Sequence, residues 1–207
     1  MATPQLYKTT GIILKRTNWG EGDKTLTVLC SHIGKKRFIG KGIRKISSRR
    51  ASHLELFSQT EFLIHKGKVY DYVTGATVIH AYGSSYGNLK QIAVAYAACE
   101  IIDRLIMEGQ EHDEAFYVLQ RVLTDIEHEN GQPIAQKLSL FVDEILVMLG
   151  YKRKETVSKS LGEALSGVER IIERRVRSAT LLAKSGIDTS ERFVPYVAKA
   201  HSDLLSL

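Results

Sequence analysis

The spacing of apolar residues changes once along the chain, and this change constrains the fold more than any other feature. From residue 8 to about residue 80, apolar and polar residues alternate with the period of two of a β-strand, in short runs separated by Gly, Asp and Ser. After Asn88, apolar residues recur every three or four positions, as they do on one face of a helix. This pattern predicts an α+β, two-domain chain, with domains over residues 1–80 and 81–207.

Five strands are predicted in the first part, at residues 9–16, 24–30, 35–43, 54–65 and 68–79. The fourth is the clearest, because Leu54, Phe62 and Ile64 share one face while Glu55 and Glu61 fall on the other. Five short antiparallel strands in a segment of this length are typical of a small closed barrel, of which the OB-fold is the version that binds nucleic acid strands. We therefore predict an N-terminal OB-fold β-barrel followed by an α-helical domain.

The second part predicts a helical bundle, entered through a Gly/Ser/Tyr hinge at residues 81–88. Its first helix is expected from the N-cap Asn88 to just before Gly109, and the others at residues 113–128, 133–149, 160–184 and about 190–206. The apolar face of these helices predicts a core that includes Ile102, Phe116, Leu119, Phe141, Ile145 and Leu149.

Charge is divided unevenly between the two parts. Residues 1–80 hold 14 Lys and Arg against 5 Asp and Glu, whereas residues 81–207 hold 15 against 18. One segment of the first part has eight bases and no acid: Lys35, Lys36, Arg37, Lys41, Arg44, Lys45, Arg49 and Arg50. A solubilising loop is one interpretation, but clustered bases that displace the counterions of a phosphate backbone explain the segment better. We predict these eight residues as a nucleic-acid-binding track.

Single strands also need aromatic side chains on which bases can stack. Trp19, the only tryptophan, falls in a predicted turn next to the basic strands, so it is included in the predicted nucleic-acid-binding site. Tyr7 and Phe38 are close in sequence to the same strands, and their patterns favour core or rim positions.

No enzyme, cofactor or metal site is predicted. The segment GKKRFIGKG at residues 34–42 resembles a phosphate-binding loop, but it has Gly42 where Ser or Thr should hold magnesium. The histidines lack the spacing of metal ligands, and Cys30 and Cys99 lie far apart within apolar patterns that predict buried free thiols. Without a signal peptide or an apolar stretch long enough to cross a bilayer, a cytoplasmic location without membrane contact is expected.

Three segments in this order resemble the RecO family of bacterial recombination mediators: GEGDKTLTVL at 20–29, GKKRFIGKGIRK at 34–45 and HLELFSQTEF at 53–62. FVDEILVMLGY at 141–151 resembles a later helix of the same family. The resemblance implies an OB-fold, binding to single- and double-stranded DNA, strand annealing, and loading of recombinase onto DNA coated by single-strand-binding protein. It further implies a RecR-like partner, contact with single-strand-binding protein, and association with the nucleoid.

One departure from the family pattern follows LGY at 149–151. Many RecO proteins carry a four-cysteine zinc motif there, whereas residues 152–175 of this chain contain no cysteine. The zinc, and the partner contacts that depend on that region, are therefore not carried over. The alternative function is an RNA-binding OB-fold module related to translation, and a more distant one is a nucleotide-hydrolysing enzyme.

Overall fold

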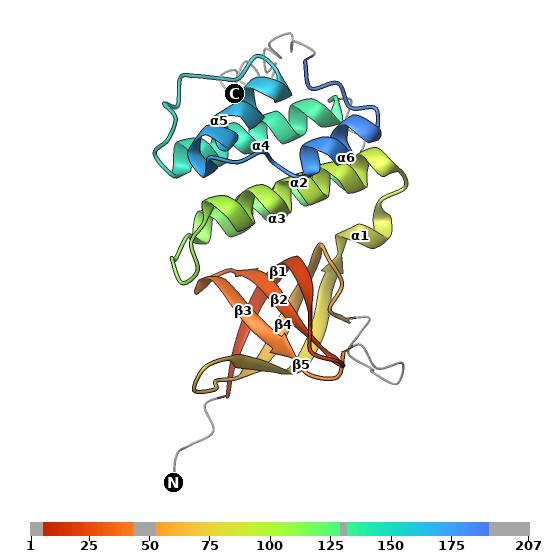
Figure 1. The fold of residues 1–207 in the computed structure, drawn as a ribbon, viewed down its shortest axis with the longest axis vertical. Coiled ribbons are helices and arrows are strands. Elements are labelled where there is room, and N and C mark those ends of the chain that lie inside the picture. Colours follow the sequence, from red (N-terminus) through yellow and green to blue (C-terminus); the bar gives the residue numbers. More distant parts are fainter. Residues whose placement is uncertain (1–5, 44–52, 129–131, 191–207) are drawn as a thin grey trace, which may run out of the picture.

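The computed structural model describes residues 6–43, 53–128 and 132–190, which form a β-barrel stacked on a layered group of helices (Figure 1). The strands are β1 (Leu6–Trp19), β2 (Asp23–Cys30), β3 (Gly34–Gly40), β4 (Ser58–His65) and β5 (Asp71–Ala81). The helices are α1 (Tyr82–Ser85), α2 (Leu89–Leu105), α3 (Asp113–Glu127), α4 (Ile134–Met148), α5 (Leu161–Ile172) and α6 (Ser178–Lys184). The α+β prediction is confirmed.

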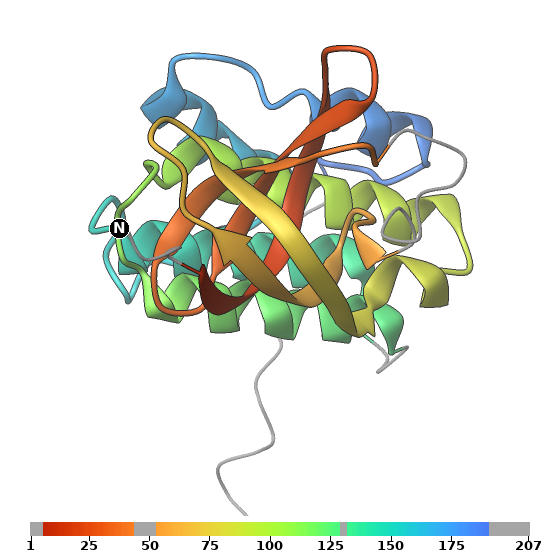
Figure 2. The same cartoon turned by 90° about the horizontal axis from the view of Figure 1, so that it is seen from below.

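The five strands close into a barrel in the order β1-β2-β3-β5-β4, which Figure 2 shows from below. Neighbouring strands are antiparallel except β3 and β5, which pair in parallel over two residues, Phe38 with Asp71 and Ile39 with Tyr72. The long strand β1 pairs with β4 through its first half and with β2 through its second half, and a bulge between Ile13 and Lys15 bends it. A five-stranded barrel of this kind is the predicted OB-fold.

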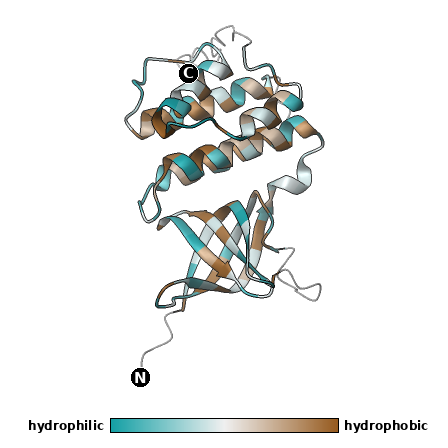
Figure 3. Cartoon of the chain, in the orientation of Figure 1, coloured by the Kyte–Doolittle hydropathy of each residue, from teal (hydrophilic) through white to brown (hydrophobic). Residues whose placement is uncertain are grey.

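Alternation along the strands builds the barrel core, and Figure 3 shows it as alternating hydrophobic and hydrophilic residues. The buried interior consists of Ile13, Leu26, Val28, Cys30, Phe38, Ile43, Leu54, Phe62, Ile64 and Val73. Strand β4 begins at Ser58 rather than at the predicted residue 54. The reason is Phe57, which has a φ of 63° and donates its N–H to the carbonyl of Ile13 at 3.1 Å, so that the chain turns before the strand starts.

The helices α2, α3, α4 and α5 begin within one residue of the predicted positions. Asn88 caps α2 by accepting a hydrogen bond from the Gln91 N–H at 3.0 Å, and Pro133 precedes the first residue of α4. Gly150, with a φ of 77°, ends α4 in the left-handed conformation that glycine adopts readily. The helix predicted at 190–206 lies almost entirely outside the described residues.

The single helix predicted at 160–184 is wrong, because the chain forms α5 and α6 with a turn between them. Glu173 adopts a left-handed conformation with a φ of 52°, which ends α5. The Glu100 carboxylate on α2 then accepts hydrogen bonds from the N–H groups of Arg177 and Ser178, at 2.9 and 2.7 Å. Burial opposes ionisation of Glu100, but these hydrogen bonds and nearby Arg104 lower its pKa overall. A capping residue far away in the sequence therefore fixes this break.

The helical core extends onto the outside of the barrel. Ile12, Leu14 and Leu29 point away from the barrel interior and belong to the same buried cluster as the helices. Of the predicted core residues, Ile102, Phe116, Leu119, Phe141 and Ile145 are buried and Leu149 is partly buried against them. The predicted hinge is also part of this structure, since it contains α1 and its residues Tyr82 and Tyr86 are buried.

The β2–β3 turn and the α2–α3 loop hold the two parts together. The Gly109 N–H donates to the carbonyl of Lys35 at 2.9 Å, and a Cβ atom on Gly34 would lie 1.8 Å from the Gln110 carbonyl oxygen. Only glycine fits at this contact. The Lys35 ammonium is buried and donates to the backbone carbonyl of Asp103 and, at 3.2 Å, to its carboxylate.

The two cysteines are free and buried, Cys30 in the barrel and Cys99 in the helical core. Burial raises the pKa of Cys30 to about 12 and also raises that of Cys99, so both remain neutral thiols. Among the described residues, no three His, Cys, Asp or Glu side chains are placed to share a metal ion. No helix in the described ranges has the length and apolar character needed to span a bilayer.

Candidate nucleic-acid interface

The outer face of β2 and β3 is covered by the helical part at Leu29 and Lys35, and Arg37 is exposed further along it. Leu26 and Phe38 pair across these strands inside the barrel, so their neighbours Thr27 and Arg37 pair on the outside. Because β5 runs parallel to β3 beside Phe38 and Ile39, residues at the start of β5 join the same surface. The strand 2–3 face is the one on which OB-folds bind oligonucleotides.

Two aromatic side chains from different loops meet on this surface. Trp19 ends β1, Tyr70 precedes β5, and their ring centroids lie 5.4 Å apart with an edge-to-face angle of 66°. Trp19 is 46% exposed and Tyr70 is 44% exposed, so large parts of both rings face solvent. Exposed aromatic rings held by a rigid barrel offer a stacking surface to an unpaired base.

A cation and a third aromatic ring continue the surface. The Lys41 ammonium lies 4.4 Å from the centroid of the Tyr72 ring, in a cation–π contact. Lys66 and Lys68, in the loop that carries Tyr70, are exposed. The surface therefore combines aromatic rings with positive charge, as single-strand-binding grooves do.

The predicted basic residues of β3 do not share one environment. Arg37 is exposed and forms an ion pair with Glu108, with nitrogen–oxygen distances of 2.7 and 2.6 Å, and this hydrogen bond raises the pKa of Arg37. Lys35 is 9% exposed and bound to Asp103, so its charge is directed into the domain junction. Lys36 is partly buried on the inward-facing side of β3, and although burial raises the pKa of Cys30 overall, the charge of Lys36 acts in the opposite direction.

Comparison with known proteins places this arrangement in a family. The profile described as "Recombination protein O N terminal" matches residues 1–82, and "Recombination protein O C terminal" matches residues 86–165. The chain belongs to the RecO family. This RecO chain is 32% identical over 148 residues to the DNA repair protein RecO of Roseiflexus sp. (strain RS-1), which covers 72% of the chain and 51% of that protein.

Other RecO relatives give a similar result. The DNA repair protein RecO of Dehalococcoides mccartyi (strain ATCC BAA-2266 / KCTC 15142 / 195) is 30% identical over 152 residues, or 73% of this chain and 59% of the relative. The DNA repair protein RecO of Moorella thermoacetica (strain ATCC 39073 / JCM 9320) is 36% identical over 120 residues, or 58% of this chain and 45% of the relative. The chain spans about half the length of the curated relatives that it matches.

Only part of the predicted binding site of this RecO chain lies within the described residues. Trp19, Arg37 and Lys41 lie on the barrel surface, Lys36 is half-buried, and Lys35 is occupied by Asp103. The remaining predicted bases lie outside the described residues: Arg44, Lys45, Arg49 and Arg50. Their role in binding stays a prediction.

Sequence reasoning missed Tyr70 and Tyr72. The segment HKGKVYDY at residues 65–72 contains two lysines and two tyrosines around a turn, and this composition was the available signal. What the sequence does not contain is the parallel pairing of β3 with β5, which brings this loop beside Lys41.

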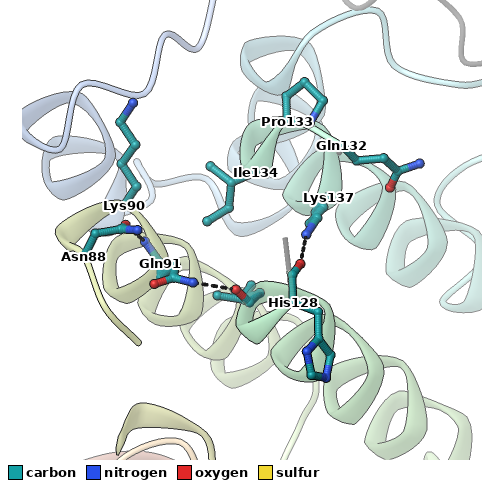
Figure 4. Close-up of a pocket in the computed structure, with 9 residues that line it drawn as sticks. Asn88, Lys90, Gln91, His128, Gln132, Pro133, Ile134 and Lys137 are labelled. Carbon is teal, nitrogen blue, oxygen red and sulfur yellow. Dashed lines mark hydrogen bonds between the residues drawn. The ribbon is translucent and has the colours of Figure 1, made fainter. Parts of the chain in front are cut away.

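A hollow of 380 Å³ lies between the ends of α2, α3 and α4, and the polar side chains that line it stabilise the helix ends (Figure 4). The buried Lys137 ammonium donates to the backbone carbonyls of Asp125 and His128, at 2.6 and 2.7 Å. Gln91 donates to the carbonyl of Ile126 at 2.8 Å. These side chains satisfy the last carbonyls of α3, so the polar groups of this hollow serve the fold.

The exposure of Trp19 allows a direct test of the barrel surface. Because Trp19 is the only tryptophan, we expect its emission to change when single-stranded DNA binds. Replacing Tyr70 by Leu should weaken binding by roughly 1–3 kcal/mol, the usual value of one base–aromatic stack. Tyr117→Leu, which removes an exposed tyrosine from α3, is the matched control. Unchanged emission at saturating DNA would remove Trp19 from the site.

Proposed function

We propose that this RecO-family chain acts in DNA repair and homologous recombination by binding single- and double-stranded DNA. The observation that carries the proposal is the exposed Trp19–Tyr70 pair beside Lys41 on the outer face of an OB-fold barrel. The names of the relatives, which are DNA repair proteins, support the same role. In this proposal bases stack on the aromatic rings, while the basic side chains contact phosphates without reading sequence.

Annealing of complementary strands is the activity that this surface would promote. Two strands repel each other because both carry negative phosphates, and basic side chains reduce that repulsion. The process requires no nucleophile and no general base, so we propose a non-enzymatic role. With a RecR-like partner, the chain would then promote recombinase loading onto DNA coated by single-strand-binding protein, in the cytoplasm and in association with the nucleoid.

An annealing assay tests this proposal against the alternative of an RNA-binding module. Complementary DNA oligonucleotides are mixed with the protein, and duplex formation is followed beside an equivalent pair of RNA strands. We expect the protein to accelerate DNA annealing, with an effect that falls as salt rises. Acceleration of RNA annealing alone would favour the RNA-binding function, and acceleration of neither would contradict annealing.

A further inference from the structure

The basic residues of the helical part are concentrated in one stretch of the sequence. Residues 152–184 contain nine Lys and Arg against four Asp and Glu, whereas residues 100–151 contain three against eleven. The helix α5, central to the basic stretch, lies on the side of the helices away from the barrel (Figure 1). The helical part therefore has a basic stretch of its own, and attraction to a polyanion is its most direct consequence.

An exposed tyrosine lies directly before this stretch, on a backbone held by a hydrogen bond. Tyr151 follows Gly150 at the end of α4, and its N–H donates to the carbonyl of Leu146 at 2.8 Å. This bond is typical of a helix that ends in a glycine turn, and it fixes the backbone from which the ring projects. Tyr151 is 58% exposed. An exposed aromatic ring on a fixed backbone loses less conformational freedom when a flat ligand stacks on it than a ring on a mobile loop would.

Tyr151 lines two neighbouring hollows, and each also contains an arginine. Arg174 lines the larger hollow, of 810 Å³, whose wall includes the apolar side chains of Met148 and Ile172. Arg170 lines the smaller hollow, of 310 Å³. Both arginines are exposed, and neither forms an ion pair with another described residue. Two available guanidinium groups thus flank one aromatic ring.

Two other basic side chains at these hollows already form ion pairs. Arg104 pairs with Glu100 at 2.7 Å, and Lys152 pairs with Asp143 at 2.5 Å. One glutamate lines each hollow as well, Glu163 the smaller and Glu173 the larger, and Glu163 accepts a hydrogen bond from the backbone N–H of Lys159 at 2.7 Å. Arg170 and Arg174 are therefore the positive groups that remain for a ligand.

The backbone that carries Arg174 is also fixed. Arg174 lies directly after Glu173, which has a left-handed conformation. The Val176 N–H donates to the Glu169 carboxylate at 2.9 Å. The next two residues are held by Glu100 on α2. A ring and two cations on an ordered backbone form a site that needs little rearrangement to bind.

We propose that Tyr151, Arg170 and Arg174 form a second binding site for single-stranded nucleic acid. A base would stack on Tyr151, and the arginines would contact the phosphates on either side of it. This inference rests on the proposed function, because annealing brings two strands together and a second site would hold the second strand while the barrel holds the first. Arginine favours a phosphate ligand, since its planar group can donate two hydrogen bonds to one phosphate.

The test compares the native chain with the variant Tyr151→Leu/Arg170→Gln/Arg174→Gln. A short oligo(dT) is titrated while Trp19 emission reports on the barrel, and native mass spectrometry counts the oligonucleotides bound to each chain. We expect two per native chain and one per variant chain, with the same DNA-induced change in Trp19 emission in both and annealing slower by roughly tenfold or more in the variant. The control Lys90→Gln/Arg121→Gln removes two positive charges elsewhere on the helices and should behave like the native chain.

Each outcome separates this site from the proposed function. If the folded variant keeps both the second oligonucleotide and its annealing rate, the second site is overturned while the barrel's role stands. If the control variant loses as much as the test variant, general charge rather than this site is responsible, and the proposal fails. If the native chain anneals no DNA, the proposed function fails, and the count of bound oligonucleotides still decides whether Tyr151, Arg170 and Arg174 bind a strand.

Discussion

Replacing Arg44, Lys45, Arg49 and Arg50 together by alanine should weaken DNA binding equally for all sequences and flatten its salt dependence. Each lost phosphate contact reduces the slope of log affinity against log salt by roughly 0.7 on single strands, so four contacts account for about three units. When salt rises fourfold, the factor by which affinity falls should therefore be roughly fifty times larger for the native chain than for the variant. Titrations at several salt concentrations measure this slope directly.

The position of these residues in the chain is the reason for expecting so large an effect. They follow directly after Lys41 and Ile43, at the end of the strand whose outer face lies beside Tyr72. A control that removes four bases outside both proposed binding sites, Lys8, Lys15, Lys90 and Arg121, keeps the same net charge change. If the two variants show the same slope, the segment between Lys41 and His53 is not the phosphate track.

Periodicity predicted the barrel well because each strand buries one face. Leu26, Phe38 and Phe62 all point into the same interior, so alternation and strand position agree. The break between α5 and α6 could not be predicted in this way, since the apolar pattern continues through it. It depends on Glu100, which lies on another helix and caps the backbone at Arg177 and Ser178. Such distant hydrogen bonds leave no periodic signal in the sequence.

The candidate site shows the same limit at the level of single side chains. A run of bases indicates a basic segment, but it does not say which ammonium groups reach solvent. Lys35 is removed from the surface by Asp103, which is 68 positions further along the chain. Tyr70 joins the surface only because its loop folds back beside Trp19. Composition thus predicted a basic surface, whereas tertiary contacts determine which side chains belong to it.

The largest effect on stability in the helical part is expected from Asp143 and the residues that it binds, Lys152 and Ser158. Asp143 accepts hydrogen bonds from the Lys152 ammonium at 2.5 Å and from both the N–H and the hydroxyl of Ser158 at 2.7 Å. The side chains of Asp143 and Lys152 are 10% and 14% exposed. The cluster therefore ties the loop between α4 and α5 to α4.

Replacing Asp143 by alanine should lower the free energy of unfolding by about 3–5 kcal/mol, because it leaves the buried Lys152 ammonium without a counter-ion and the buried Ser158 N–H without an acceptor. The neighbouring Glu144 provides a matched control, since it forms an exposed ion pair with Arg121 whose loss should cost at most about 1 kcal/mol. Urea denaturation of both variants measures the difference. Adding Lys152→Met to Asp143→Ala should restore part of the loss, because the double variant no longer buries an unpaired charge. Equal stability of the Asp143→Ala and Glu144→Ala variants would show that the cluster does not hold the loop.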